Sequence, residues 1–395
     1  MLDLSSLTLL ATFLFTLLVG QSAFNGDTVH LRISVSPDIV KTGLSESVAE
    51  DIFTATAADL TSGESLIAAP RMRVRTQPGL AATMAKKFSL DGIVSATQTT
   101  LGIETMSVMG ALMQGPPAGP ALAAKDGAAL ADNPGSKTCL NLVLIVTHPA
   151  SGIEQKRISQ CDTHDPVTLL QQGASWAMEQ VAPYRVVLSE VLKVARGTGG
   201  DLAHAKATAE RVLSRPEGWE HAPERAMTNN LLAMMALAEK DPVVADHWLA
   251  AALAVPEIPP EIERLLMFNQ AMVATVRKQP GEARMLMTKA MAKRHAIELP
   301  DFAANSLIMQ ALTAWSGGDT VAAETLLRNA AQVSPRNEAA HAYLAKLLER
   351  KGDTEGAKRE AHTANIARRF DPVLQSLVVT LFWIDPVQGT IEWRK

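Results

Sequence analysis

The densest cluster of polar side chains in the sequence runs from Cys161 to Asp165 and reads Cys-Asp-Thr-His-Asp. Thiol, imidazole and carboxylate groups are those that bind zinc or transfer protons. Neither zinc-ligand spacing nor a closing partner is visible around the cluster. Asp165 directly precedes a proline, the order typical of a helix N-cap followed by the first helical residue. We therefore interpret Asp165 as a cap and His164 as an exposed turn residue, and predict no metal site.

The remaining reactive side chains show no catalytic pattern. The sequence has no nucleophile elbow, phosphate loop or C-x-x-C spacing. Four histidines fall on separate expected helices without partners one turn away: His204, His247, His341 and His362. We predict that the protein is not an enzyme and needs no cofactor. A third hypothesis, a hydrolase, is disfavoured because no acid/base pair converges. It would be revived if substitution of Asp91 and His164 abolished a measured turnover.

The two cysteines, Cys139 and Cys161, flank a pair of β-patterned runs joined by a Pro-Ala-Ser-Gly turn. If His148 pairs with Ile153, Leu140 faces Cys161, and a one-residue bulge would bring the two cysteines opposite each other. The alternatives are a disulfide, which needs an oxidising compartment, and two free thiols. The disulfide is the favoured interpretation.

The first residues carry a location signal. Residues 7–20 form an uncharged apolar run of 14 residues, short for a membrane span and suited to a secretory signal. Residues 2–24 hold only one charge, Asp3, and are long enough for an anchor. The positive residues that usually precede a signal are missing, which a lost upstream cytoplasmic segment would explain. We expect residues 1–24 to be a signal peptide or membrane anchor. The protein is then periplasmic, inner-membrane anchored or secreted.

Composition separates the rest of the chain into two parts. The net charge of −4 over 395 residues comes with no concentrated basic face, so a nucleic-acid partner is not expected. Residues 28–195 alternate strand-like and helix-like runs and indicate one α/β (α+β) module. Its expected elements are strands at 29–35, 71–75, 93–103, 140–148 and 153–161 and helices at 44–60, 80–88, 167–181 and 184–194. The helix at 44–60 places Val48, Ile52, the methyl of Thr56 and Leu60 along one face, with Phe53 beside them.

A long insertion is expected inside this module, at residues 104–137. It contains Met106, Met109 and Met113, several prolines and little charge. The favoured interpretation is a flexible low-complexity loop. The alternative is a Met-rich contact with a membrane or a partner.

The last half predicts helix pairs. Gly318-Asp319 and Gly352-Asp353 lie 34 residues apart (352 − 318), with small residues at matching positions around them: Ala311 and Ala345, Ala323 and Ala357, Leu327 and Ala361, Ala330 and Ala364. Two further pairs precede them, with turns at Asp241 and Pro280, each 39 residues before the next turn (280 − 241 and 319 − 280). A leading helix is expected at 201–213. This pattern resembles the tetratricopeptide repeat, and implies an all-α solenoid at residues 201–372.

The α/β module also resembles a known family. The residues that carry the resemblance are Gly43-Leu44-Ser45-Glu46, Asp91-Gly92-Ile93-Val94, the His148-Pro149-Ala150-Ser151-Gly152 turn and the helix after Asp165. They are similar to the module that precedes repeats in membrane regulators of the CadC type, and to the amino-terminal domain of the Tol-Pal propeller protein. The DNA-binding winged helix of those regulators is not found in this sequence.

The fold resemblance implies a function in binding. We expect a membrane-anchored or exported bacterial-type adaptor that binds protein or peptide partners in the groove of the solenoid. The expected groove residues lie on the first helices of the pairs: Asn229, Asn269, Asn305 and His341. Asparagine there could bond the backbone of an extended peptide, or could simply solvate an exposed face. The alternative function is a signal-sensing ectodomain related to CadC-type regulators.

The carboxyl-terminal residues 373–395 are unusually apolar at their start but too short to span a membrane. We predict a C-terminal cap laid over the last repeat, because a terminal repeat must cover its open face. The alternative is a docking face that uses Phe382, Trp383 and Trp393.

Overall fold

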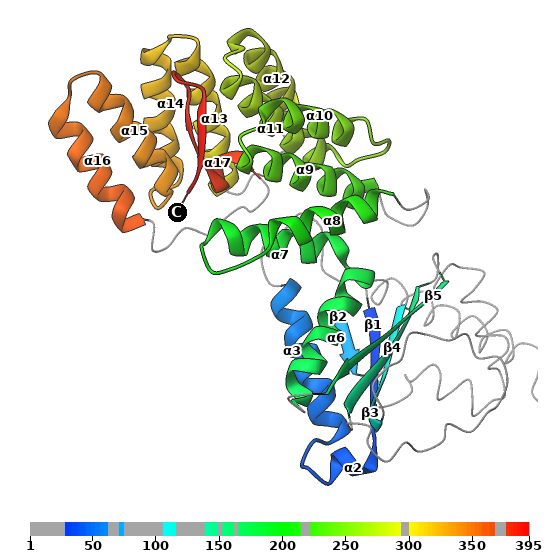
Figure 1. Cartoon of the computed structure of the whole chain (residues 1–395). Helices are drawn as coiled ribbons and strands as arrows, with labels where there is room; N and C mark the ends of the chain where they lie inside the picture. The colour runs from blue at the N-terminus through cyan, green and yellow to red at the C-terminus, as the bar shows by residue number, and fades with distance from the viewer. Residues whose placement is uncertain are drawn as a thin grey trace, which may run out of the picture. The chain divides into compact units, whose positions relative to one another are not determined.

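The computed structural model describes residues 28–61, 71–74, 106–115, 139–148, 152–161, 165–214, 222–293, 300–367 and 377–394 (Figure 1). The chain divides between Pro183 and Tyr184 into an α/β unit and a helical unit. The expected signal or anchor at residues 1–24 lies outside the described residues, as do the helix expected at 80–88 and the strand expected at 93–103. No helix in the described part of the chain is both long and apolar enough to cross a membrane.

The α/β unit is built on one five-stranded sheet. Its strands are β1 (Thr28–Val35), β2 (Arg71–Val74), β3 (Met106–Gly115), β4 (Cys139–His148) and β5 (Gly152–Gln160), in the spatial order β2-β1-β3-β4-β5. Strand β1 is parallel to β2 and β3, whereas β3, β4 and β5 form antiparallel pairs. The helices of this unit are α2 (Pro37–Val40), α3 (Glu46–Thr61) and α6 (Pro166–Val181).

Helices α3 and α6 pack against one another and against β1 and β4. Gly173 of α6 lies so close to β4 that an added Cβ would come 2.4 Å from Leu142 Cδ2. On α3 the predicted Phe53 and Leu60 are buried, but Val48 is 42% exposed and Ala49 is buried in its place. Asp165 caps α6 as predicted, accepting a hydrogen bond from Val167 N at 3.0 Å.

The insertion expected at 104–137 is partly wrong. Residues 106–115 form β3, which pairs with β1 on one side and β4 on the other. Alternate residues from Val108 to Leu112 are buried. Gly110 has no Cβ, and Leu144 Cδ2 lies 3.1 Å from the position that a Cβ at Gly110 would occupy. The methionines suggested a loop, but this alternation fits a strand in a sheet. Residues 116–138 lie outside the described residues.

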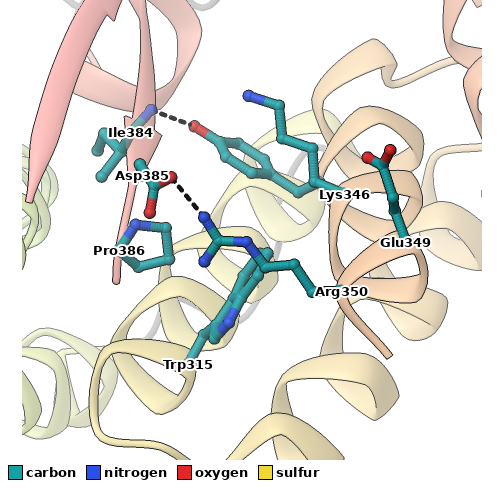
Figure 2. Close-up of a pocket in the computed structure, with 8 residues that line it drawn as sticks. Trp315, Lys346, Glu349, Arg350, Ile384, Asp385 and Pro386 are labelled. Atoms are coloured by element: carbon teal, nitrogen blue, oxygen red, sulfur yellow. Dashed lines mark hydrogen bonds and ion pairs between the residues drawn. The ribbon is translucent and has the colours of Figure 1, made fainter. Parts of the chain in front are cut away.

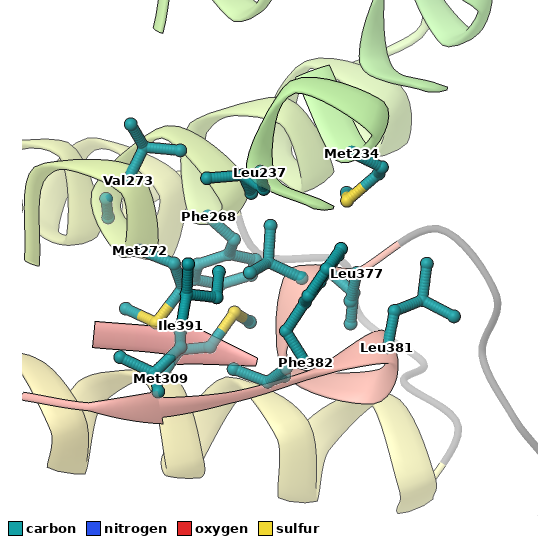
Figure 3. Packing of buried hydrophobic residues seen from close by; sticks show 14 of the residues in the cluster. Met234, Leu237, Phe268, Met272, Val273, Met309, Leu377, Leu381, Phe382 and Ile391 are labelled. Carbon is teal, nitrogen blue, oxygen red and sulfur yellow. The ribbon is translucent and has the colours of Figure 1, made fainter. Parts of the chain in front are cut away.

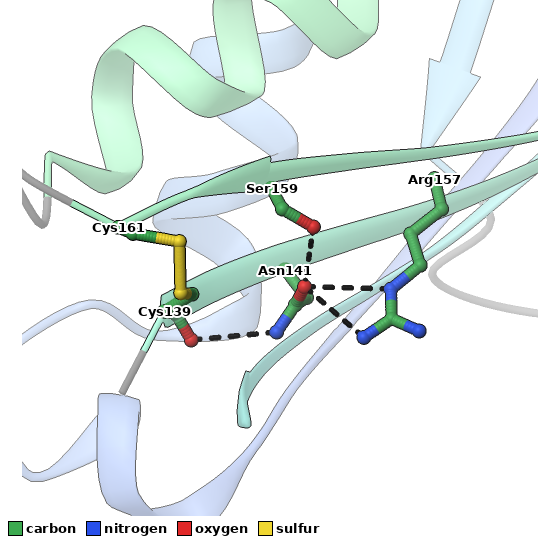
Figure 4. Close-up of a disulfide and its surroundings, with 5 residues drawn as sticks. All are labelled: Cys139, Asn141, Arg157, Ser159 and Cys161. Atoms are coloured by element: carbon green, nitrogen blue, oxygen red, sulfur yellow. Dashed lines mark hydrogen bonds between the residues drawn. A yellow bond between two sulfur atoms is a disulfide. The ribbon is translucent and has the colours of Figure 1, made fainter. Parts of the chain in front are cut away.

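The structure contains the predicted Cys139–Cys161 disulfide (Figure 4), with the two Cα atoms 4.1 Å apart. The predicted hairpin register was wrong by one residue. His148 pairs with Gly152 and Leu140 with Gln160, so the cysteines face each other without a bulge.

A buried amide stabilises this end of the hairpin. Asn141 is 1% exposed, and its Oδ1 accepts hydrogen bonds from Arg157 Nη2 at 3.2 Å and from the Ser159 hydroxyl (Figure 4). Because both donors lie on β5, Asn141 links the two strands beside the disulfide.

Replacing Cys139 and Cys161 together with alanine is expected to lower the unfolding free energy of the α/β unit by about 2–4 kcal/mol. The bond closes a loop with a sequence separation of 22, and its loss releases conformational freedom in the unfolded chain. Urea unfolding with and without reductant measures the effect. The reduced wild-type protein should match the double variant, and reductant should leave the double variant unchanged.

The helical unit begins with α7 (Pro183–Ala195) and α8 (Leu202–Leu213). Helix α7 was expected in the α/β module, but its residues Tyr184, Val187 and Val191 belong to the core of the helical unit. Four helix pairs follow in the described residues: α9 (Ala222–Ala238) with α10 (Pro242–Leu253), α11 (Pro260–Val276) with α12 (Pro280–Ala292), α13 (Pro300–Ser316) with α14 (Thr320–Val333), and α15 (Glu338–Arg350) with α16 (Thr354–Ala367).

The turn inside each pair has the same design. Lys240, Lys278, Gly318 and Gly352 each adopt a left-handed conformation, with φ between 59° and 86°. In three pairs the next residue is an aspartate whose side chain accepts hydrogen bonds from the start of the second helix: Asp241, Asp319 and Asp353. In the α11–α12 pair this position is Gln279 rather than Pro280, so the turns at 241, 279 and 319 are spaced by 38 and 40 residues.

The small residues predicted between the helices are buried, with one exception. Ala311, Ala323 and Ala330 are fully buried. Ala361 is exposed, because α16 is the last helix of the stack in the described residues and no further pair covers it. The helical unit ends with α17 (Val378–Leu381) and the hairpin of β6 (Phe382–Asp385) and β7 (Thr390–Trp393).

Candidate partner-binding face

We call the face formed by the first helices of the pairs, α9, α11, α13 and α15, the inner face. Residues 377–394, here called the C-terminal segment, lie on it (Figure 1). Helix α17 contacts α11 and α13, β7 contacts α9, and β6 bonds to α15. From the sequence we predicted that these residues cap the last repeat. In the structure, the C-terminal segment instead crosses the first helices of all four pairs.

The contact is largely apolar. Seven side chains of the C-terminal segment are at most 5% exposed: Leu377, Val378, Val379, Leu381, Phe382, Ile384 and Ile391. The inner-face side chains of this core include Met234 and Leu237 of α9, Phe268 and Met272 of α11, and Met309 of α13 (Figure 3). Full burial of one such side chain contributes about 1.5–3 kcal/mol. The segment is therefore part of the core of the helical unit.

Two side chains of the inner face bond the backbone of the segment. Asn269 Oδ1 accepts from Val378 N at 2.9 Å, and Asn269 Nδ2 donates to Asn230 Oδ1 at 2.8 Å. The hydroxyl of Tyr343 accepts from Ile384 N at 2.8 Å. Because these bonds go to main-chain N–H groups, they do not depend on which side chains the segment carries.

Two ion pairs hold the hairpin to α15. Arg350 Nη2 lies 2.7 Å from Asp385 Oδ2, and Arg394 Nη2 lies 2.7 Å from Glu338 Oε2. The second pair is the better shielded, with side chains 9% and 14% exposed. Arg394 also covers the ring of Trp383, 4.8 Å from its centroid.

A cleft of about 350 Å³ opens between β6 and the helices α13 and α15 (Figure 2). Its lining includes Trp315, Tyr343, Lys346, Glu349, Arg350, Ile384, Asp385 and Pro386. The guanidinium of Arg350 lies 5.3 Å from the centroid of Trp315, between that ring and Asp385. Burial alone would raise the pKa of Asp385, but hydrogen bonds from Gln388 N and Val387 N together with Arg350 outweigh it and lower the pKa.

The pKa of Tyr343 is raised to about 12, because burial disfavours the phenolate; the bond from Ile384 N and the charge of Arg394 oppose this in part. The unfolded value is about 10. A raised folded pKa means that the neutral phenol stabilises the fold fully below pH ~10, and that this contribution is lost as the pH rises through about 12.

Alkaline titration is therefore expected to release the hairpin as Tyr343 ionises, near pH 12. Phenolate absorbance and helical circular dichroism measure the two events together. Tyr343→Phe, which cannot ionise, should lose this absorbance step. Ionisation of Tyr343 near pH ~10 with an unchanged fold would contradict the burial of its hydroxyl.

The four residues predicted to bind a partner are all buried, at most 9% exposed. Asn229 Nδ2 donates to Arg225 O within its own helix. Asn305 Oδ1 accepts from Asn337 Nδ2 at 3.0 Å. The two ring nitrogens of His341 lie 2.8 Å from Glu360 Oε2 and 3.1 Å from Pro335 O. Asn269 alone of the four has a hydrogen bond to the C-terminal segment described here, and partner binding by any of them stays a prediction.

Sequence reasoning missed Asn230, Tyr343, Glu338 and Arg350, which position or hold the segment. Asn230 is adjacent to Asn229 in the sequence. The rotation of helix α9 about its own axis decides which of these two side chains faces Asn269. The described residues contain no group of three or more histidine, cysteine, aspartate or glutamate side chains placed to hold a metal ion.

A family comparison matches residues 314–380 to the tetratricopeptide repeat. This match lies within the helical unit, whose helix pairs form a tetratricopeptide-like solenoid. Three solved structures similar to this chain share 14–16% sequence identity with it. Against PilF of Pseudomonas aeruginosa, the match covers 47% of this chain and 76% of the other at a TM-score of 0.35. The match to MamA covers 45% of this chain and 92% of the other at a TM-score of 0.31. The match to a chain of the APC/C hetero-tetramer Cut9–Hcn1 covers 53% of this chain and 39% of the other at a TM-score of 0.38. No curated protein matches the sequence.

Proposed function

We propose that this protein is an exported or membrane-anchored adaptor that binds protein or peptide partners through its tetratricopeptide repeats. One observation carries the proposal. The inner face holds a polypeptide, the short helix and hairpin of the C-terminal segment, by apolar contacts and by bonds from Asn269 and Tyr343 to its backbone. Such a face recognises polypeptide as a class, since main-chain bonds supply affinity and apolar pockets supply selectivity.

Export is supported by two features of different kinds. The apolar run at residues 7–20 suits a secretory signal or part of an anchor. The Cys139–Cys161 disulfide suits an oxidising compartment, because cytosolic thiols are kept reduced. Together they favour a protein that is periplasmic, anchored in the inner membrane or secreted.

Site-specific photocrosslinking in cells tests the binding role. A crosslinker is placed at Lys346, an exposed residue of α15 that lines the cleft, and as a matched control at Val321, which is 70% exposed on α14. We expect a defined partner protein to be crosslinked from Lys346 and not from Val321. Equal crosslinking from both positions, or none from either, would contradict a partner site at this edge of the inner face.

Thiol alkylation of whole cells tests export. With Cys139 and Cys161 joined in the periplasm, we expect alkylation of both cysteines only after reduction, seen as a mobility shift. The chain lacking residues 1–24 serves as the control and should be alkylated without reduction. Alkylation of the full-length protein before reduction would overturn the export proposal.

A further inference from the structure

Strand β5 forms one edge of the five-stranded sheet in the described part of the chain. It pairs with β4 along one side, and no other described strand pairs with it. Residues 152–157 are all exposed, and the side chain of Ile153 is 72% exposed. An edge strand of nine residues presents a row of backbone N–H and C=O groups to which a further strand can bond.

The charges on β5 determine which strand fits this edge. Glu154 and Lys156 lie beside Val146 and Leu144 of β4, whose side chains are buried on the side of the sheet that carries the helices. Both charged side chains therefore share that side, where Lys156 Nζ lies 5.8 Å from the centroid of the Trp176 ring. Charges on an edge strand oppose pairing when the incoming strand brings like charges beside them.

The order Glu-Gln-Lys at residues 154–156 is complementary to itself. When two copies of β5 run antiparallel with their Gln155 residues opposite each other, each Glu154 faces a Lys156. A register centred on Lys156 or on Glu154 would instead place like charges opposite each other. A shift of one residue would put the helices of the two copies on opposite sides of the joined sheet.

We propose that β5 pairs antiparallel with β5 of a second copy of this chain, with Gln155 on the two-fold axis. Glu154 of each copy then pairs with Lys156 of the partner subunit. Ile153 lies against the apolar stem of Arg157 of the partner subunit, which removes an exposed aliphatic side chain from water. The pairing goes beyond the adaptor function, and it joins two helical units in one molecule, so that a partner with two binding sites is held with greater avidity.

The helices leave room for this pairing. Helix α6 packs mainly on β4, one strand in from the edge. In the joined sheet the two copies of β4 are three strand spacings apart, which is about 14 Å. Packed helices need about 8–10 Å between their axes. The two α6 helices therefore fit side by side on the same side of the sheet.

Sedimentation equilibrium of the full chain in a density-matched detergent tests the pairing. We expect a reversible dimer. Glu154→Lys and Lys156→Glu should each weaken its Kd roughly 10- to 100-fold, because two opposite-charge pairs become two like-charge pairs. The double variant, with both substitutions, should return the Kd to within about threefold of the wild-type value. Asp51→Lys, an exposed change on α3, is the control for charge reversal and should leave the Kd unchanged.

Hydrogen exchange of the wild-type protein tests the same edge without any substitution. The β5 amides that do not bond to β4 should exchange slowly at protein concentrations above the Kd and rapidly after dilution below it. In folded Glu154→Lys they should exchange rapidly at both concentrations. The wild-type result decides the question if a single variant does not fold.

Three outcomes would overturn the proposal. A monomer at every concentration, with rapid exchange along β5, would mean that the charges guard the edge against pairing. A dimer that survives both single substitutions would place the contact elsewhere on the molecule. Failure of the double variant to restore the dimer, while circular dichroism shows it folded, would refute the pairing of Glu154 with Lys156. Crosslinking from Lys346 tests the adaptor function separately, and its result leaves this inference unchanged.

Discussion

Replacing Phe382 with alanine is expected to lower the unfolding free energy of the helical unit by about 3–5 kcal/mol, the cost of removing a fully buried aromatic ring. Phe382 is 0% exposed and its ring stacks on Trp393, with 4.4 Å between centroids. It lies among side chains of α9, α11 and α13, so its loss leaves a cavity bounded by three helices (Figure 3). Urea unfolding followed by helical circular dichroism measures the change.

Val387→Ala provides the control for this substitution. Val387 lies in the turn of the same hairpin and is 51% exposed, so its truncation should change the unfolding free energy by no more than about 0.5 kcal/mol. If Phe382→Ala costs as little as Val387→Ala, the C-terminal segment does not pack on the repeats in solution.

Asn269→Ala is expected to lower the same free energy by about 2–4 kcal/mol, since an unsatisfied buried polar group costs about 1–3 kcal/mol. The substitution removes the acceptor of Val378 N and the donor to Asn230 Oδ1, and Asn269 itself is fully buried. The lost bonds join α9, α11 and the C-terminal segment, so the loss should increase hydrogen exchange at the start of α17.

Asn229→Ala is the matched comparison on the neighbouring first helix. Its side chain bonds to Arg225 O, one turn earlier in the same helix, and alanine has the higher helix propensity. We expect a loss of about 1 kcal/mol or less. Comparable losses in the two variants would show that Asn269 has no special role in holding the segment.

The helix pairs could be predicted because their determinants are local. Glycine at 318 and 352 permits the left-handed turn, and the aspartate after each caps the next helix. Small residues at fixed spacing, such as Ala311 and Ala323, then set how closely the helices approach. The glycine recurs in two pairs and the aspartate in three, so the sequence carries these signals more than once.

The α/β unit was less predictable, because strand identity depends on neighbours far away in the sequence. Met106–Gly115 is a central strand between β1 and β4, yet its methionines and glycines suggested a loop. The register error at His148 had a similar origin. The Pro-Ala-Ser-Gly turn does not distinguish pairing with Gly152 from pairing with Ile153, whereas the disulfide and Asn141 do.

The candidate site could not be predicted as a whole. The sequence identified Asn269 as an inner-face residue that could bond an extended backbone, and in the structure it bonds the first amide of helix α17 of the same chain. The contact joins residues 109 positions apart, and no local pattern reports a contact at that separation. For the same reason Tyr343 and Arg350 looked like ordinary helix residues, until the structure placed Ile384 and Asp385 beside them.

Hydrogen exchange of the C-terminal segment tests most directly whether the inner face is filled by this protein's own chain. The amides of Val378 and Ile384 donate to Asn269 and Tyr343, and the side chains of both residues are 1% exposed. We predict that both amides exchange as slowly as the amides in the middle of α11 and α13. Exchange at the rate of an unstructured peptide, with the helices still protected, would contradict the account.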